Sequence, residues 1–190
     1  MVVAKWEPGV LFARLARHLN RELGDIEALI GDDTGIARHG DHCVGTARQY
    51  SETLGRVDRC QVIPSLHAAG PSGSFCVGAR LYLPDSWTDA PERLKKAGVP
   101  DGVTFSTKWE LMLGLLEQAT QTSPGLASLG WENLPFIGDA GYGDVSEFRR
   151  ELTRWKRPYL LEVMLTTAVW APGTGPEHPT GLSAKSAAAY

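Results

Sequence analysis

The stretches GDDTG (residues 31–35) and GDAGYG (residues 138–143) each follow a short apolar run. We expect each run to be a strand with an aspartate at its end, followed by glycine and another small residue. Glycines at such positions let a bulky partner, such as a metal ion or a phosphate, approach the backbone. Aspartates on neighbouring strand ends commonly hold the divalent metal in phosphoryl transfer. The two stretches therefore predict a site where strands end.

Length and composition describe one domain with a sizeable core. The chain has 190 residues, of which 43% are hydrophobic, and its net charge is −3. Global charge therefore gives no sign of nucleic-acid binding, and any DNA contact must come from local patches. Three Cys without paired spacing fit a reducing cytoplasm. The sequence starts without the apolar stretch of a signal peptide, and no apolar run is long enough to span a bilayer, so we expect a cytoplasmic protein without a membrane partner.

Hydrophobic periodicity predicts an alternation of strands and helices. We expect strands over residues 27–32, 42–50, 56–67, 75–83, 134–139 and 159–165. We expect helices over residues 7–23, 107–120 and 144–156, the second opened by a Thr107–Glu110 capping box and the third capped around Asp144. This order fits an α/β fold, a mixed sheet flanked by helices as in a ribonuclease H-like domain, although periodicity alone does not separate it from other α/β folds.

Several segments carry a more specific pattern. They are DDTG (32–35), VGTARQYSETLGRVDRCQV (44–62), RLYLPDSWTD (80–89), AGVP (97–100), FSTKWEL (105–111), DAGYGD (139–144) and PYLLEV (158–163). In this order they resemble the DDE superfamily endonuclease domain of bacterial insertion-sequence transposases, and the resemblance covers residues 4–172. It implies a ribonuclease H-like fold, Mg²⁺ or Mn²⁺ as cofactor, DNA as substrate and strand cleavage with strand transfer in transposition. It also implies a bacterial, nucleoid-associated protein that forms an oligomer or binds an intact transposase.

The resemblance also divides the chain. Residues 1–25 match the end of a helical region that precedes the catalytic core, residues 26–170 match part of the core, and the Gly- and Pro-rich residues 171–190 are expected to be a disordered tail. The core is expected to be incomplete at its C-terminus, because the family's third acid is a glutamate on a helix beyond the last strand seen here.

Asp33 and Asp139 are the predicted catalytic residues and metal ligands. Asp32 competes with Asp33, because successive side chains of a strand point to opposite faces and only one of the two can join Asp139. The family motif, aspartate followed by threonine, favours Asp33. The alternative is that the aspartates merely cap loops, since Asp-Gly turns are common.

The missing third acid leaves the activity open. Glu162 is a possible substitute, but an isolated acid in an apolar strand usually points outward. We expect this chain alone not to transpose DNA. The alternatives are a non-catalytic remnant that binds DNA or an intact transposase, and a metal-dependent nuclease of the same fold.

A basic segment follows the second aspartate. The residues expected to contact DNA phosphates are Arg149, Arg150, Arg154 and Arg157, with Arg48 lining the same cleft. The alternative is a solvated helix face on which the arginines pair with Glu147 and Glu151 at helical spacing.

Overall fold

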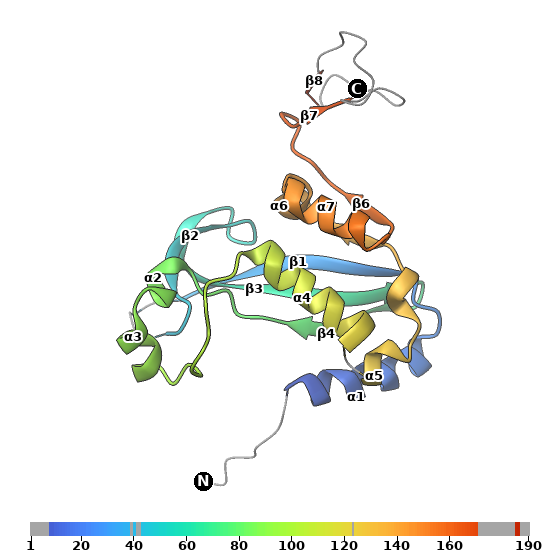
Figure 1. Cartoon of the computed structure of the whole chain (residues 1–190), viewed down its shortest axis with the longest axis horizontal. Helices are drawn as coiled ribbons and strands as arrows, with labels where there is room; N and C mark the ends of the chain where they lie inside the picture. The colour runs from blue at the N-terminus through green and yellow to red at the C-terminus, as the bar shows by residue number, and fades with distance from the viewer. Residues whose placement is uncertain (1–7, 39, 41–42, 123, 171–184, 187–190) are drawn as a thin grey trace.

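The computed structural model describes residues 8–38, 40, 43–122, 124–170 and 185–186, and its centre is a six-stranded mixed sheet (Figure 1). The strands follow the order β2–β3–β1–β5–β6, and β4 also pairs with β3. Their bounds are β1 Ala28–Ala37, β2 Ala47–Ser51, β3 Arg56–Gly70, β4 Gly73–Ala79, β5 Phe136–Gly138 and β6 Tyr159–Leu161. β1 to β4 pair as antiparallel neighbours, whereas β5 and β6 run parallel to β1. The predicted mixed α/β sheet flanked by helices is confirmed.

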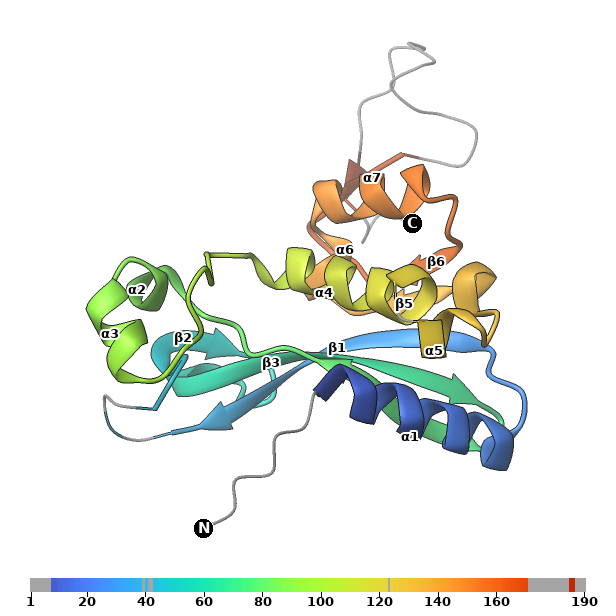
Figure 2. The ribbon, with the colours of Figure 1, turned by 60° about the horizontal axis from the view of Figure 1, so that its bottom comes forward.

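Helices lie on both sides of this sheet. The longer ones are α1 Pro8–Leu23, α4 Lys108–Glu117 and α7 Ser146–Arg154. The short ones are α2 Asp85–Thr88, α3 Pro91–Lys96, α5 Pro124–Ala127 and α6 Ala140–Gly143, with a π-helical turn at Gln118–Thr122 and a 3₁₀ turn at Trp131–Asn133. Figure 2 shows α4 and α7 on one side of the strands and α1 on the other, where α1 packs along β4.

The first strand is longer than its sequence suggests. The apolar run predicts a strand that ends at residue 32, but β1 continues to Ala37 because its antiparallel pairing with β3 extends from Ala28 opposite Ala69 to Ala37 opposite Cys60. The parallel pairing with β5 is shorter and reaches only Gly31 opposite Gly138. Asp33 therefore lies inside β1, just past the point where β5 ends.

The helix starts test the capping predictions. The capping box of α4 is confirmed: the backbone N–H of Glu110 donates to Thr107 Oγ1 at 3.3 Å, and that of Thr107 donates to Glu110 Oε2 at 2.7 Å. The cap predicted for α7 is wrong, because this helix begins after Val145 without a side-chain cap. The Asp144 carboxylate instead accepts the backbone N–H of Met164 at 3.3 Å.

Residues 84–104, which lie outside every predicted strand and helix, contain α2 and α3. Trp87 is buried there, and its indole N–H donates to the carbonyl of Thr46 at 2.9 Å. The guanidinium of Arg93 lies 3.6 Å from the centre of the same ring. This tryptophan anchors a segment whose prolines and charges suggest an irregular loop.

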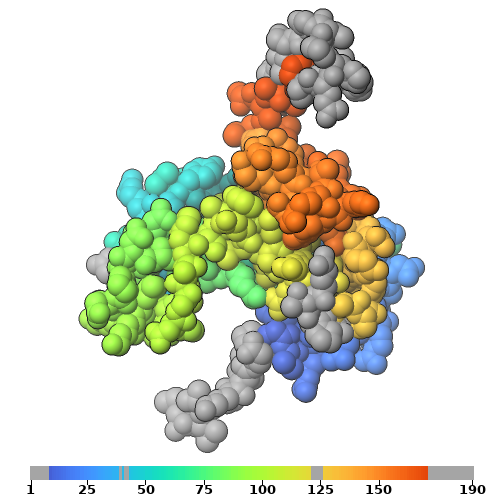
Figure 3. All heavy atoms as spheres, in the orientation of Figure 1, coloured from blue at the N-terminus to red at the C-terminus, as the bar shows by residue number. Residues whose placement is uncertain are grey.

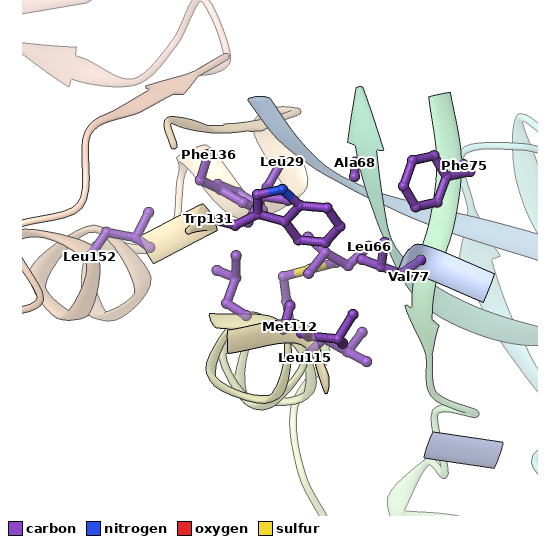
Figure 4. Packing of buried hydrophobic residues seen from close by; sticks show 14 of the residues in the cluster. Leu29, Leu66, Ala68, Phe75, Val77, Met112, Leu115, Trp131, Phe136 and Leu152 are labelled. Carbon is purple, nitrogen blue, oxygen red and sulfur yellow. The ribbon is translucent and has the colours of Figure 1, made fainter. Parts of the chain in front are cut away.

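One hydrophobic cluster joins the sheet to α4 and α7 (Figure 4). Leu29, Leu66 and Phe136 contribute from three strands, and Met112 and Leu152 from the two helices. Ala13 and Ala16 of α1 belong to the same cluster. The helix expected to be a remnant of a preceding region thus packs on the core, while the predicted domain boundaries remain a prediction.

The expected disordered tail over 171–190 lies outside the described residues, except for Lys185–Ser186. These two form β8, which pairs with β7 (Ala168–Val169). Among the described helices, none combines the length and the apolar character needed to cross a membrane.

Candidate active site

The sheet brings Asp33 and Asp139 to neighbouring strands. Asp33 lies two residues beyond the last β1–β5 pair, Gly31 opposite Gly138, and Asp139 directly follows that pair on the other strand. Because β1 and β5 are parallel and adjacent, the two aspartates lie at the same end of this strand pair. The side chain of Asp139 makes no capping hydrogen bond to α6, which starts immediately after it. A loop-capping role therefore does not account for Asp139.

Both carboxylate oxygens of Asp33 have partners. Oδ1 accepts a hydrogen bond from the hydroxyl of Tyr142, and Oδ2 lies 2.6 Å from Nζ of Lys108. The Asp33 side chain is 13% exposed and that of Lys108 is 42% exposed. Lys108 is the first residue of α4, so the capping box that starts this helix also places the ammonium group beside β1.

Tyr142 is a buried donor to this carboxylate. It comes from α6 and packs edge-on against Phe136 of β5. Burial raises the pKa of the Tyr142 hydroxyl, and the negative charge of Asp33 and the hydrogen bond to it raise it further. The hydroxyl therefore keeps its proton and orients the Asp33 carboxylate.

A third carboxyl group, that of Glu52, meets Asp139. Glu52 follows β2 on the turn that leads into β3. A side-chain hydrogen bond with Asp139 raises the pKa of Glu52, as do burial and the charge of Asp139. The charge of Lys108 lowers the pKa of Glu52 and that of Asp33 raises it. All four charged groups are therefore close enough to interact.

Oδ1 of Asp139 is a buried oxygen without a hydrogen-bond partner. A carboxylate has no hydrogen to donate, so the Glu52 carboxylate can satisfy this oxygen only through a shared proton or a bound cation. An unpaired buried oxygen of this kind is costly unless something neutralises it. Hard oxygen ligands are the ones that divalent cations such as Mg²⁺ and Mn²⁺ prefer, so the donor set fits such an ion.

The glycines of the two motifs have different roles. A Cβ at Gly31 would lie 2.6 Å from the Phe136 ring, so this glycine serves core packing and not the approach of a ligand. A Cβ at Gly141 would lie 3.1 Å from Asp139 Oδ1 and 3.8 Å from Glu52 Oε1. A Cβ at Gly35, the glycine that follows Asp33, would lie 1.8 Å from Ser51 Oγ, so of these three glycines Gly141 is the one that lies beside the carboxylates.

Asp32 lies beside a hollow that Asp33 does not line. Its Oδ1 accepts the backbone N–H of Asp33 at 2.8 Å, and its side chain lines a hollow of about 510 Å³. Asp139 and Glu162 line the same hollow, together with apolar residues of β1, β5 and β6. Asp139 therefore lines this hollow together with Asp32, and it also lies near the group formed by Asp33, Glu52 and Lys108.

The described residues hold no ready-made cluster of three or more His, Cys, Asp or Glu side chains that could hold a metal ion. The two oxygens of Asp33 are bound to Tyr142 and Lys108, and the ammonium group of Lys108 neutralises the charge of this carboxylate. Asp33 and Asp139, with Asp32 as the less favoured alternative, remain the predicted ligands of a divalent cation.

The predicted DNA-binding arginines lie in different environments. Arg150 and Arg154 are exposed on α7 and pair with Glu147 at 3.0 Å and with Glu151 at 2.5 Å. Arg149 donates to the carbonyl of Gly143. These contacts match the helical charge pairing given above as the alternative, although the exposed guanidinium groups of Arg150 and Arg154 remain accessible.

Arg157 and Arg48 differ further. Arg157 is 5% exposed and donates to the carbonyls of Trp131 at 3.3 Å and Leu134 at 2.7 Å. Burial lowers the pKa of its guanidinium. The predicted contact of Arg157 with a DNA phosphate is therefore wrong. Arg157 follows the end of α7, and its guanidinium is buried against backbone carbonyls and not accessible to a phosphate. Arg48 is exposed on β2, opposite Arg59 of β3.

Sequence reasoning missed Glu52, Lys108 and Tyr142 as site residues. All three lie in segments that carry the family resemblance, which is a usable signal. Residue spacing does not place Glu52 near Asp139, because the packing of the β2–β3 turn against β1 decides this.

The family model described as DDE superfamily endonuclease matches residues 3–187, which include both aspartates, the β2–β3 turn and α7. No curated protein matches the chain. A match over nearly the whole length is decisive for membership, and the mixed sheet flanked by helices is consistent with a ribonuclease H-like DDE fold. The chain therefore belongs to the DDE superfamily endonucleases.

Proposed function

We propose that this chain cuts the phosphodiester backbone of DNA as a DDE-type transposase domain, with Asp33 and Asp139 as the central carboxylates. Members of this superfamily generally use divalent metals, and we propose Mg²⁺ or Mn²⁺ as the ion. The observation that carries the proposal is the buried, unpartnered Oδ1 of Asp139, which directly follows β5, the strand beside β1. An oxygen in this position is available to a cation.

Each residue has a part that follows from its contacts. A bound divalent ion lowers the pKa of water and stabilises charge on the leaving oxygen. Asp33 and Asp139 provide oxygens for it, and the Tyr142 hydroxyl holds the Asp33 carboxylate in one orientation. Lys108 places a positive charge next to the site, where it favours the approach of a DNA phosphate.

The exposed arginines of α7 support DNA as the substrate. Arg150 and Arg154 lie on the helix that follows Asp139 through α6, and Figure 3 shows α7 on the molecular surface. We propose that these two side chains contact phosphates beside the cut site, with Arg48 as a further contact from β2. Arg149 contributes less, because its guanidinium is bonded to a backbone carbonyl.

A plasmid assay tests the proposal. Supercoiled DNA is incubated with the purified chain and Mg²⁺ or Mn²⁺, and nicking is followed on a gel. Metal-dependent nicking that disappears in Asp139→Asn and in Asp33→Asn is the expected result. Asp32→Asn is the matched control, and loss of nicking in that variant alone would move the site to the other face of β1.

The same reaction separates the alternatives. DNA binding without nicking would favour a non-catalytic remnant, to which the occupied oxygens of Asp33 already give some support. Nicking without joining of DNA ends is the expected outcome, and it would not separate a transposase domain from a metal-dependent nuclease. Joining that depends on both aspartates would establish strand transfer and contradict the expectation that this chain alone does not transpose DNA.

A further inference from the structure

A second hollow, of about 460 Å³, lies beside α1 and has a basic lining. Five of its six lining residues belong to α1, and its described lining includes no acidic side chain. The lining residues are Arg14, Arg17, His18, Asn20, Arg21 and Leu129. Figure 3 shows α1, in dark blue, on the molecular surface. This hollow is therefore a local positive patch on a chain whose net charge is −3.

The three arginines of this hollow share one face of α1. Arg14 lies three residues before Arg17, and Arg21 lies four residues after Arg17, so successive helical turns bring their side chains together. All three are exposed. Like charges at these spacings destabilise a helix. The arrangement therefore costs stability in the free chain, and a bound anion relieves this cost.

Ion pairing does not relieve the repulsion on α1 as it does on α7. On α7, Arg150 and Arg154 each pair with a glutamate three residues earlier, at 3.0 Å and 2.5 Å. Glu22 is the only acid of α1, and among the ion pairs of the described residues none involves an arginine of this helix. Arg17 donates from Nε to the carbonyl of Ala13 at 3.3 Å. Most guanidinium donors of α1 thus remain available to an anion.

The length of this basic face fits a row of phosphates better than a single anion. Arg14 and Arg21 lie two helical turns apart, which is about 10.5 Å along the axis. A DNA strand carries one phosphate about every 3.4 Å of its axis, so the face spans several consecutive phosphates. His18 and Asn20 line the same hollow and carry N–H groups that can donate to phosphate oxygens.

The apolar side of α1 argues against a membrane surface as the ligand. A basic helix that lies in a membrane interface buries its apolar side in lipid. In this chain Ala13 and Ala16 are buried in the hydrophobic cluster, and Leu19 packs against it. The protein core therefore already covers that side. Leu11 and Leu15 remain exposed, so anionic vesicles are included in the test.

We propose that the basic face of α1, formed by Arg14, Arg17, His18 and Arg21, is a second DNA surface, which binds the phosphate backbone without reading its sequence. DNA as the ligand rests on the proposed function, but this surface is separate from the aspartates and from α7. Figures 1 and 2 both show α1 and α7 on opposite sides of the molecule. The two helices therefore contact different stretches of the DNA backbone.

Duplex binding in EDTA measures this surface without metal or activity. The full chain is titrated against a fluorescently labelled duplex at several salt concentrations, and the affinity is read from anisotropy. We expect Arg14→Glu with Arg21→Glu to weaken binding about tenfold or more and to reduce the salt slope by about 2, since each lost phosphate contact removes about 0.9. Lys95→Glu with Lys96→Glu on α3 is the control with the same change in net charge. It should change the affinity by about twofold at most, because salt screens distant charges.

The outcomes separate this inference from the proposed function. If Arg150→Glu with Arg154→Glu lowers the affinity and the α1 pair behaves as the control, α1 is not a DNA surface and the proposed function stands. If the α1 pair lowers the affinity while nicking is the same in Asp139→Asn as in the wild type, this inference stands and the proposed function fails. A wild-type chain that binds no DNA at any salt concentration overturns both.

Two competitors identify the anion that the α1 hollow binds. Sodium phosphate and sodium chloride are compared at equal ionic strength, and we expect them to displace the duplex equally. Displacement by phosphate at a much lower ionic strength would assign the hollow to a free phosphate ion and overturn the inference. Binding to anionic lipid vesicles that the α1 pair loses, with DNA binding unchanged, would assign the face to a membrane and overturn it as well.

Folding is checked in the same series. Arg14 and Arg21 are exposed and repel their neighbours, so we expect the double variant to melt at least as high as the wild type. If Arg14→Glu with Arg21→Glu does not fold, Arg14→Gln with Arg21→Gln provides the second test, because glutamine favours helices about as well as arginine does and carries no charge. Weaker DNA binding with an unchanged melting temperature supports the proposal, and unchanged binding contradicts it.

Discussion

Nζ of Lys108 lies 2.6 Å from Oδ2 of Asp33, which joins the first residue of α4 to the middle of β1. The charge of the same ammonium group also acts on Glu52. The ammonium group of Lys108 therefore already neutralises part of the negative charge of these carboxylates. A divalent ion bound at this site would compete with Lys108 for the oxygens of Asp33.

Replacing Lys108 with Met should strengthen metal binding. The substitution keeps the apolar stem and removes the competing charge, and an ion pair this exposed corresponds to about a two- to fivefold gain in Mn²⁺ affinity. Titration of the chain with Mn²⁺, in which the free ion is followed by its electron paramagnetic resonance signal, measures this affinity. Lys96→Met, at an exposed lysine of α3, is the control. Weaker binding in Lys108→Met would show that Lys108 supports the metal site and does not compete with the ion.

Replacing Tyr142 with Phe should destabilise the fold. The change removes the hydroxyl that donates to Asp33 and leaves a partly buried carboxylate oxygen unsatisfied, which costs about 1–2 kcal/mol in the free energy of unfolding. Urea denaturation measures the loss. Tyr159→Phe is the control, because Tyr159 is exposed and its hydroxyl lies 3.4 Å from that of Thr153. Equal losses of unfolding free energy in the two variants would show that the hydrogen bond of Tyr142 to Asp33 does not stabilise the fold.

The same tyrosine predicts an alkaline effect. The unfolded chain releases the Tyr142 proton near pH 10, whereas burial and Asp33 raise its pKa in the folded protein. The unfolded state then holds fewer protons, so the contribution of Tyr142 to stability is complete below pH 10 and decreases as the pH rises beyond it. The stability of Tyr142→Phe should depend less on pH in this range than that of the wild type, and a steeper decrease would contradict the assignment.

Replacing Gly143 with Ala should damage the fold near the site. A Cβ there would lie 1.7 Å from the carbonyl oxygen of Glu162, and a backbone atom cannot move away as a side chain can. We expect a loss of about 3 kcal/mol in unfolding free energy, measured by denaturation. Gly114→Ala on α4 is the control, since the space around it is open and alanine favours helices by about 1 kcal/mol. A tolerated Gly143→Ala would mean that α6 and β6 can separate.

Reversing two charges on α7 should weaken DNA binding. If Arg150 and Arg154 contact phosphates, changing both to Glu lowers the affinity and reduces the salt slope by about 1 for each lost contact. Fluorescence anisotropy with a labelled duplex at several salt concentrations measures both. Lys95 and Lys96 of α3, changed to Glu together, form the control with the same change in net charge. If both double variants weaken DNA binding equally, the arginines of α7 make no specific phosphate contact and α7 is only a solvent-exposed helix.

The sequence was sufficient for the features that depend on local pattern. Apolar spacing predicts α1 and α4, and the Thr107–Glu110 pair correctly marks where α4 begins. Strand content and order predict the mixed sheet. The sequence failed where tertiary pairing decides, as in β1, whose extension to Ala37 depends on β3. It also failed at α7, where Asp144 bonds the backbone of Met164 and does not cap the helix.

The same division holds for the site. The sequence by itself determined Asp33 and Asp139 as candidates, because aspartates beside glycines after apolar runs are a local pattern that the family shares. Only the tertiary structure decided their surroundings. Lys108 and Glu52 reach the site from α4 and from the β2–β3 turn, and Arg157 turns inward to bind backbone carbonyls. The physical reason is that charge interactions and burial depend on distances between segments far apart in the chain, which residue spacing does not encode.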